Sequence, residues 1–322
     1  MNCFNCCFNI EHSFRNYIYD KGLFLDLFPN LKLYDCPQCG IVSIDHAVID
    51  NQSLNRYYSQ AYRNENEIRD ENARSDRDAY FKARTDGQYA AISHHSNEIP
   101  INNILEFGSG YGFSLTAMGK KFPNAKLFSY DIDDRSRLSN PNISVDDGSV
   151  KYDIIIISHV LEHLLYPQKT VKELSNKLNP KGLFLIDVPN EARMVKAKKS
   201  NQNSMEPHIT FFSLKSFRNF FKSNFKDLEI VDLFTSGDEW VNPDNLQEDE
   251  SGNLILPPSR KSDLGKLKLI KEFLRENFYL LFAALRYIYN FNKPEYDFSS
   301  FSVNHVEDTH NDCRVILRKK AS

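Results

Sequence analysis

The chain has 322 residues, is 41% hydrophobic and carries a formal net charge of −3. This size and apolar content allow one large or two modest domains with a substantial core. The charge balance shows no electrostatic footprint for nucleic acid, so we expect no nucleic-acid partner unless a local basic patch exists. The N-terminus lacks a basic region followed by an apolar run, and no segment is apolar enough to span a bilayer. We therefore expect a soluble, cytoplasmic protein.

Five of the six cysteines fall within the first 39 residues. They include two Cys-x-x-Cys pairs, Cys3 with Cys6 and Cys36 with Cys39. Without an export signal, cysteines clustered in this way are more typical of metal ligands than of disulfides. Four thiolates suit a tetrahedral structural Zn2+ and leave no open position for catalysis. Residues 1–45 are thus predicted to form a zinc-ribbon-like segment, in which Cys7 is an alternative to Cys6; free thiols are the other interpretation.

Residues 46–99 are polar, charged and compatible with helices, and Pro100 follows them. The run 65–84 is dense in charge of both signs, and we expect most of it to form a solvated helical face. Four side chains of this region either line a substrate cleft or pack in a core: Arg56, Tyr57, Tyr58 and Tyr62. We expect a helical linker on the substrate side of the molecule.

Three apolar runs follow, and each ends in residues that can bind a ligand or take part in catalysis. The first leads into Glu106-Phe-Gly108-Ser-Gly110-Tyr-Gly112, the pattern of a buried strand that turns tightly into a helix. Glycine has no Cβ, so the backbone there can approach a ligand. The second run, 126–130, ends in Asp131, where an acid can accept hydrogen bonds from ribose hydroxyls. The third, 152–157, ends in Ser158-His159-Val-Leu-Glu162-His163-Leu.

The alternation of strands and helices over residues 101–190 predicts a parallel sheet with right-handed crossovers. Further elements follow in order: a helix at 113–121, a strand at 183–188, a polar lid or substrate loop at 191–207, a helix at 214–222 with Ser213 as its N-cap, and strands at 228–234 and 313–318. The sequence therefore predicts an α/β protein.

These motifs together resemble those of the class I S-adenosylmethionine-dependent methyltransferases. The resemblance rests on the glycine run from Glu106, on Asp131, and on His159-Val-Leu-Glu162-His163-Leu. It covers roughly residues 100–235 and the last strand, and it implies a Rossmann-like, mostly parallel sheet with an antiparallel last strand. A nicotinamide dehydrogenase is the competing interpretation, but the last glycine of its fingerprint would have to stand at Phe113.

The resemblance also implies which residues hold S-adenosyl-L-methionine. The implied donor-binding residues are Glu106, Gly108, Gly110, Gly112 and Asp131, with Ser158 and His159 on the methyl side. An acid that contacts the adenine amino group is expected near residues 142–151, and Asp146 is our candidate. A simple turn at Asp147-Gly148 is the alternative for that segment.

A hydroxyl acceptor needs a base near neutral pH, and histidine suits that task. His208 is the first candidate, because it follows the strand at 183–188, where substrate loops meet the donor, and no adjacent apolar alternation explains it. The stretch Glu206-Pro-His208-Ile-Thr-Phe-Phe-Ser also resembles one that precedes a helix in many of these enzymes. His163 is the second candidate and His159 the third, with Glu162 as a residue that orients a histidine or binds substrate. An amine or carboxylate acceptor would need no strong base.

The segment Cys36-Pro-Gln-Cys39-Gly-Ile-Val and the later Leu54-Asn-Arg-Tyr-Tyr-Ser-Gln-Ala-Tyr62 resemble the N-terminal region of certain bacterial methyltransferases. Those enzymes act on sugars, either nucleotide-linked or in surface polysaccharide. The resemblance implies O-methylation of a small polar acceptor, above all a sugar hydroxyl, in polysaccharide biosynthesis. The long C-terminal domain usual in C-methylating members is not recognised here. The alternatives are methylation of another small molecule or natural product, and a zinc-ribbon scaffold with a degenerate donor pocket.

Residues 236–311 form an insertion between the last two predicted strands, and 312–322 supply the last strand and tail. An apolar helix is predicted at about 264–289, flanked by lysines. It packs on the core or on a partner subunit of a homodimer, caps the substrate, or makes peripheral contact with a membrane.

Overall fold

The structure is a computed structural model that describes residues 1–17, 23–62, 71–96, 99–133, 140–197, 207–239, 247–248, 254–255, 299–305 and 310–321. The chain divides into two compact units, Met1–Trp240 with Phe298–Ser322, and Val241–Asp297. In the second unit, the short strands β11 (Gln247–Glu248) and β12 (Leu254–Ile255) pair antiparallel. The apolar helix predicted at about 264–289 lies outside the described residues.

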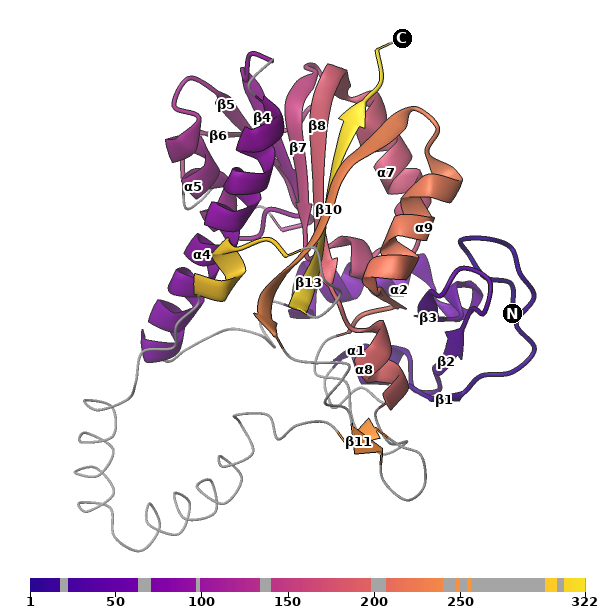
Figure 1. Ribbon diagram of the computed structural model, residues 1–322. Helices are drawn as coiled ribbons and strands as arrows, with labels where there is room; N and C mark the ends of the chain where they lie inside the picture. Colours follow the sequence, from indigo (N-terminus) through magenta and orange to yellow (C-terminus); the bar gives the residue numbers. More distant parts are fainter. Residues whose placement is uncertain are drawn as a thin grey trace, which may run out of the picture. The chain divides into compact units, whose positions relative to one another are not determined.

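A seven-stranded sheet forms the centre of the first unit, in the order β10-β13-β8-β7-β4-β5-β6 (Figure 1). Its strands are β4 (Asn103–Phe107), β5 (Lys126–Tyr130), β6 (Ile143–Val145), β7 (Tyr152–Ser158), β8 (Leu178–Pro189), β10 (Leu228–Glu239) and β13 (His310–Lys319). The five strands from β6 to β8 are parallel, whereas β13 is antiparallel to both β8 and β10. The predicted α/β fold with an antiparallel last strand is confirmed.

Helices cover both faces of this sheet. They are α4 (Glu71–Ser96) and α5 (Phe113–Lys121) on one face, and α7 (Pro167–Asn176) and α9 (Leu214–Asn224) on the other. Alternate residues of β7 pack against the helices on opposite faces of the sheet. Ile154 and Ile156 pack with α4 and α5, whereas Ile155 and Ile157 pack with α7 and α9. Because a central parallel strand is buried on both faces, β7 reads in the sequence as a continuous apolar run.

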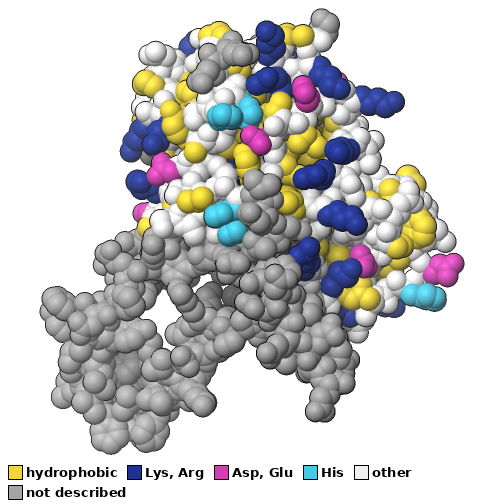
Figure 2. Space-filling model, in the orientation of Figure 1, with side chains coloured by type: hydrophobic (Ala, Val, Ile, Leu, Met, Phe, Trp, Pro, Cys, Tyr) yellow, Lys and Arg dark blue, Asp and Glu magenta, His cyan; other side chains and the backbone are white. Residues whose placement is uncertain are grey.

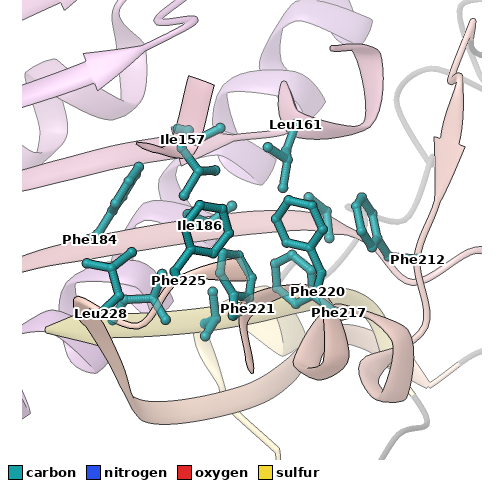
Figure 3. Packing of buried hydrophobic residues seen from close by; sticks show 14 of the residues in the cluster. Ile157, Leu161, Phe184, Ile186, Phe212, Phe217, Phe220, Phe221, Phe225 and Leu228 are labelled. Carbon is teal, nitrogen blue, oxygen red and sulfur yellow. The ribbon is translucent and has the colours of Figure 1, made fainter. Parts of the chain in front are cut away.

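Helix α9 shows how local sequence positions a layer. Its buried side chains Phe217, Phe220 and Phe221, with Phe225 just beyond, recur at helical spacing and pack beneath Phe184 and Ile186 of β8 (Figure 3). Each buried phenylalanine contributes roughly 1.5–3 kcal/mol. The Ser213 hydroxyl accepts a hydrogen bond from the Ser216 backbone N–H at 3.3 Å, so the predicted N-cap is confirmed.

A second, smaller sheet joins the N-terminal segment to the central region. Its strands run in the order β1 (Arg15–Asn16), β2 (Lys32–Asp35), β3 (Val42–Ile44) and β9 (Thr210–Phe211). Strand β9 comes from the segment that follows β8, and Val42 pairs with Phe211. The N-terminal segment is therefore hydrogen-bonded to the chain next to His208.

The remaining described elements connect these sheets. They are α1 (Leu23–Leu27), the 3-10 turns η1 (His46–Val48), η3 (Leu161–His163) and η5 (Ser299–Ser302), α2 (Asn51–Arg56), the π-helical turn η2 (Tyr57–Ala61) and α8 (Ala192–Ala197). Helix α8 occupies the start of the segment predicted as a polar loop at 191–207, of which 198–206 lie outside the described residues. Strand β8 begins before the strand predicted at 183–188 and contains an irregularity at Lys181, whose φ is 64°.

The part of the chain that the structure describes holds no helix long and apolar enough to cross a membrane. Figure 2 shows Lys and Arg side chains spread over the upper and right-hand part of the visible face, with Asp, Glu and hydrophobic side chains among them. Among the ion pairs of the described residues, the Asp227 carboxylate pairs with Lys172 at 2.9 Å and with Lys319 at 2.6 Å.

Candidate active site

A cavity of about 1190 Å³ opens at the carboxyl ends of the parallel strands. One end is lined by the turn after β4 and by the residues after β5; the other is lined by the residues after β7 and β8 and by part of the N-terminal region. Open α/β sheets bind ligands at this edge. The cavity brings together most of the predicted site residues: Glu106, Gly108, Gly110, Asp131, Ser158, His159, His163 and His208.

The glycine turn is shaped by positive φ angles. Gly108, Gly110 and Gly112 have φ of 78°, 58° and 71°, a region that disfavours side chains with a Cβ. A Cβ on Gly108 would lie 2.2 Å from Cγ2 of Val160. Gly108 and Gly110 line the cavity, while Gly112 stands at the N-cap of α5. The turn therefore brings bare backbone to the cavity wall.

Asp131 lies directly after β5 and is tied to this turn. Its Oδ2 accepts a hydrogen bond from the Gly110 N–H at 2.7 Å, and its Oδ1 accepts one from the Asp133 N–H at 2.9 Å. These backbone donors hold the carboxylate in a defined orientation at the cavity wall. This is the position at which an acid can accept hydrogen bonds from ribose hydroxyls.

Glu106, at the end of β4, is a buried carboxylate with an unmet hydrogen-bonding capacity. Its side chain is 3% exposed, and Oε2 has no hydrogen-bond partner among the described residues. Burial raises the pKa of Glu106 to about 8, and the nearby Arg84 guanidinium opposes this rise. A ligand that donates hydrogen bonds would satisfy this oxygen. This end of the cavity, beside the glycine turn, therefore fits the polar groups of S-adenosylmethionine.

We expect Glu106→Gln to remove a pH dependence of folding stability. Because burial raises the pKa from 4.5 to about 8, the folded state retains a proton that the unfolded state releases, and this contribution to stability falls as pH rises through that window. Between pH 5 and pH 8 the unfolding free energy of the wild type should therefore fall by roughly 3–4 kcal/mol more than that of the variant, measured by urea unfolding without donor. The exposed Glu229→Gln change is the control. Parallel pH profiles for wild type and Glu106→Gln would contradict the assignment.

The three predicted histidines meet around Glu162, which lies in η3 directly after β7. Oε1 of Glu162 is 3.9 Å from His159 Nδ1, 3.8 Å from His163 Nε2 and 3.9 Å from His208 Nε2. Glu162 is 1% exposed, and burial raises its pKa while His159 and His208 oppose the rise. The cluster combines residues that stand far apart in the sequence; its catalytic roles stay predictions.

Two of these histidines are held by partners on their other ring nitrogen. His208 Nδ1 lies 2.6 Å from Glu191 Oε2, and because a carboxylate only accepts, Nδ1 carries the proton. His163 Nδ1 lies 2.8 Å from the Tyr58 hydroxyl, whose O–H can donate to the Pro207 carbonyl at 3.3 Å. Both arrangements are compatible with Nε2 lone pairs turned toward Glu162.

The sequence interpretation missed several residues of this site. Glu191 follows β8, and Asp312 of β13 places Oδ2 3.5 Å from His159 Nε2. Arg84, assigned by sequence to a solvated face, is 5% exposed, lines the cavity and donates to the Tyr80 hydroxyl at 3.2 Å. Arg84 is therefore an exception within the run 65–84, most of which the sequence assigned to a solvated face. A signal was present: the buried residues Arg84, Thr85, Gln88, Ala91 and Ile92 recur at helical spacing along α4.

Other predicted residues have different surroundings. Asp146 is not among the residues that line the cavity, because its carboxylate accepts from the Tyr152 hydroxyl at 2.7 Å and pairs with Lys177 at 2.5 Å. This arrangement gives no support to its predicted contact with adenine. Ser158 lines the cavity, and its hydroxyl accepts from Gln88 Nε2 at 2.8 Å. Among the aromatic candidates, Tyr58 and Tyr62 line the cavity, Tyr57 is buried in a core, and Arg56 is exposed outside the lining.

The predicted cysteine ligands form a cluster of their own. The Sγ atoms of Cys3, Cys6, Cys36 and Cys39 lie within 4.8 Å of one another. The Cys3–Cys39 and Cys6–Cys36 pairs are 3.6 Å and 3.4 Å apart, close to the separation of about 3.8 Å that tetrahedral zinc–sulfur bonds of about 2.3 Å require. Cys7 is exposed and stands outside this group, so Cys6 completes it. The donor set and geometry fit a structural zinc ion.

The chain is similar to several methyltransferases of solved structure. No curated protein matches the sequence significantly. Among solved structures, the plantazolicin methyltransferase BpumL in complex with SAH is 16% identical, with a TM-score of 0.45 over 83% of this chain and 94% of that chain. Coclaurine N-methyltransferase bound to N-methylheliamine and SAH is 12% identical, with a TM-score of 0.41 over 72% of each chain. A putative sarcosine dimethylglycine methyltransferase from Galdieria sulphuraria is 17% identical, with a TM-score of 0.42 over 74% of this chain and 86% of that chain.

The family model described as a methyltransferase domain matches residues 55–231, more than half of the chain. The matched residues include the glycine turn, Asp131 and the histidine cluster. The chain therefore belongs to the methyltransferase-domain family.

Proposed function

We propose that the protein transfers a methyl group from S-adenosylmethionine to a hydroxyl of a small polar acceptor, with sugars as the acceptor class. One observation carries this proposal: a continuous cavity connects the glycine turn and Asp131 with the cluster of His159, His163 and His208. A donor held at the first end would direct its methyl group toward the second.

The donor end offers complementary groups for each part of S-adenosylmethionine, which supplies an electrophilic methyl group on a sulfonium. Asp131 would accept from the ribose hydroxyls, and Glu106 would accept from the methionyl ammonium. Arg84 is the buried cation beside Glu106 and suits the methionyl carboxylate. Ser158 and His159 would line the methyl side. The backbone at Gly108 and Gly110 carries no Cβ and would allow the donor to approach it closely.

At the acceptor end, the histidine cluster faces the position of the reacting hydroxyl. In an in-line displacement the acceptor oxygen forms a bond to the methyl carbon as the carbon–sulfur bond breaks and a thioether leaves. The hydroxyl proton passes to His208 Nε2, whose imidazole is oriented by the hydrogen bond from Nδ1 to Glu191. Helix η3 and the tyrosines beside it would limit the access of water.

The acceptor side is suited to a polyhydroxylated molecule. The cavity lining includes amide and charged side chains that can donate and accept hydrogen bonds: Asn51, Asn55, Lys169, Glu173 and Asn311. The rings of Tyr58 and Tyr62, with centroids 5.3 Å apart, add apolar faces against which a sugar ring can pack. Methylation of another small molecule or natural product is the alternative with the same donor site.

Donor binding and methyl transfer test the proposal. S-adenosylmethionine at about 100 times its Kd should stabilise the zinc-loaded protein by about 2.7 kcal/mol, measured as a rise in Tm. Labelled methyl groups should then pass to a nucleotide sugar but not to the matched deoxy sugar that lacks the reacting hydroxyl. Absence of stabilisation would favour a zinc-ribbon scaffold with a degenerate pocket, and transfer to amines alone would overturn the hydroxyl assignment.

A further inference from the structure

We propose that Glu162, His163 and His208 bind a divalent transition-metal cation at the acceptor end of the cavity. One oxygen and two ring nitrogens of these residues lie within 4.8 Å of one another, and all three side chains line the cavity. This site is distinct from the cysteine cluster, which consists of four thiols in the N-terminal segment. The binding of the cation requires only these residues, whereas its role in catalysis rests on the proposed function.

The first argument is the state of Glu162. Its side chain is 1% exposed and neither carboxylate oxygen has a hydrogen-bond partner in the described part of the chain. Leaving a buried carboxylate without donors costs several kcal/mol. The buried guanidinium of Arg84 lines the same cavity, and its electrostatic interactions include those with Glu106 and Asp312. Beside His159, whose Nδ1 is 3.9 Å from Glu162 Oε1, a metal cation would add positive charge in direct contact with this carboxylate.

The second argument comes from the outer ring nitrogens. Glu191 fixes the proton of His208 on Nδ1, and the chain from His163 through the Tyr58 hydroxyl to the Pro207 carbonyl allows the same for His163. In this tautomer the Nε2 atoms of both histidines can offer lone pairs beside the Glu162 carboxylate. Metal-bound histidines almost always donate their other ring N–H to a carboxylate, carbonyl or similar acceptor, so this arrangement is the one that a metal site requires.

The distances are close to those of a bound metal. Bonds of about 2.0–2.2 Å to nitrogen and oxygen place neighbouring ligand atoms about 3.0–3.5 Å apart. Oε1 of Glu162 is 3.8 Å from His163 Nε2 and 3.9 Å from His208 Nε2, and the ligand atoms of all three residues lie within 4.8 Å of one another. Binding of a cation therefore requires that these side chains move closer together by small shifts. Two imidazoles and one carboxylate form the facial set that holds metals while leaving coordination positions open.

The open positions would face the acceptor. A cation there would bind the oxygen of the reacting hydroxyl and lower its pKa, so that the proton is released to water before the oxygen attacks the methyl carbon. With the cation bound, this route replaces the transfer of the proton to His208 that was given under the proposed function, because His208 Nε2 would then be a metal ligand. More than one open position favours an acceptor with two neighbouring oxygens, such as a vicinal diol, because both can bind the same cation.

Manganese is the suitable probe, because thiolates select softer metals and the cysteine cluster would compete weakly for Mn2+. We expect zinc-loaded wild-type protein to bind one Mn2+ per chain, measured by the electron paramagnetic resonance signal of free Mn2+. Glu162→Gln and His208→Ala should each weaken this binding at least tenfold. Glu106→Gln, which alters the other buried glutamate of the cavity, and His95→Ala, which alters a histidine outside it, should bind Mn2+ as the wild type does.

A second measurement does not depend on the folding of variants. A wild-type crystal soaked in Mn2+ should show an anomalous peak between Nε2 of His163, Nε2 of His208 and Oε1 of Glu162. No bound Mn2+ in the wild type, a peak elsewhere, or equal affinity in folded Glu162→Gln would overturn the cation site. Stabilisation by S-adenosylmethionine is measured on the same samples. If the donor stabilises the protein but Mn2+ does not bind, the cation site is wrong and the methyltransferase proposal stands. If Mn2+ binds but the donor does not stabilise the protein, the cation site stands and the methyltransferase proposal is wrong.

Discussion

Replacing Asp131 with alanine will abolish S-adenosylmethionine binding while the protein remains folded. The carboxylate stands at the end of β5 and is oriented by backbone N–H groups of Gly110 and Asp133. Each hydrogen bond from a ribose hydroxyl to this charged group contributes about 1.5–3 kcal/mol. The loss of two such bonds raises Kd by at least about 100-fold. Isothermal titration calorimetry measures the affinity, and circular dichroism verifies the fold.

Two companion variants separate binding from local structure. Asp131→Asn retains an oxygen that accepts from Gly110 but removes the charge, so we expect an intermediate affinity. Asp133→Ala changes the neighbouring acid, which does not line the cavity, and its affinity should match that of the wild type. An Asp131→Ala protein with normal affinity would remove the residue from the ribose site, and with it the main support for the donor end.

Replacing Cys36 with serine will release the zinc ion and loosen the N-terminal segment. Cys36 is 1% exposed, and its Sγ lies 3.4 Å from that of Cys6 within the four-thiol cluster. A small segment of this kind depends on metal binding for much of its folding free energy. Because β3 pairs with β9 close to His208, we expect the change also to reach the acceptor end and lower turnover more than donor affinity. Metal analysis by mass spectrometry and limited proteolysis measure the two direct effects.

Cys7→Ser provides the matched control for this experiment. Cys7 is exposed and outside the cluster, so its variant should keep one zinc ion per chain and resist proteolysis as the wild type does. If Cys36→Ser also keeps its zinc, the cysteine cluster is not the metal site. If Cys7→Ser loses zinc, the ligand set must be revised to include Cys7 in place of Cys6.

Patterns between near neighbours in the sequence predicted most of the fold. The helix after the glycines was expected at 113–121 and spans those residues, because a turn with positive φ and the apolar spacing that follows are both local properties. The parallel direction of the strands, which places Asp131 and His159 at the same edge of the sheet, follows from the alternation of strands and helices. Strands β10 and β13 are longer than expected, because they pair with each other beyond the apolar centre of each strand.

The composition of the acceptor end was decided by tertiary structure. His208 meets Glu191 across 17 positions and His163 meets Tyr58 across 105, so no local pattern connects these pairs. Arg84 is buried against the sheet although its neighbours in the sequence are charged, and Asp146 is engaged by Lys177 rather than facing the cavity. Hydrophobic periodicity indicates which side of an element is buried, whereas the packing of distant elements determines which buried polar groups come into contact.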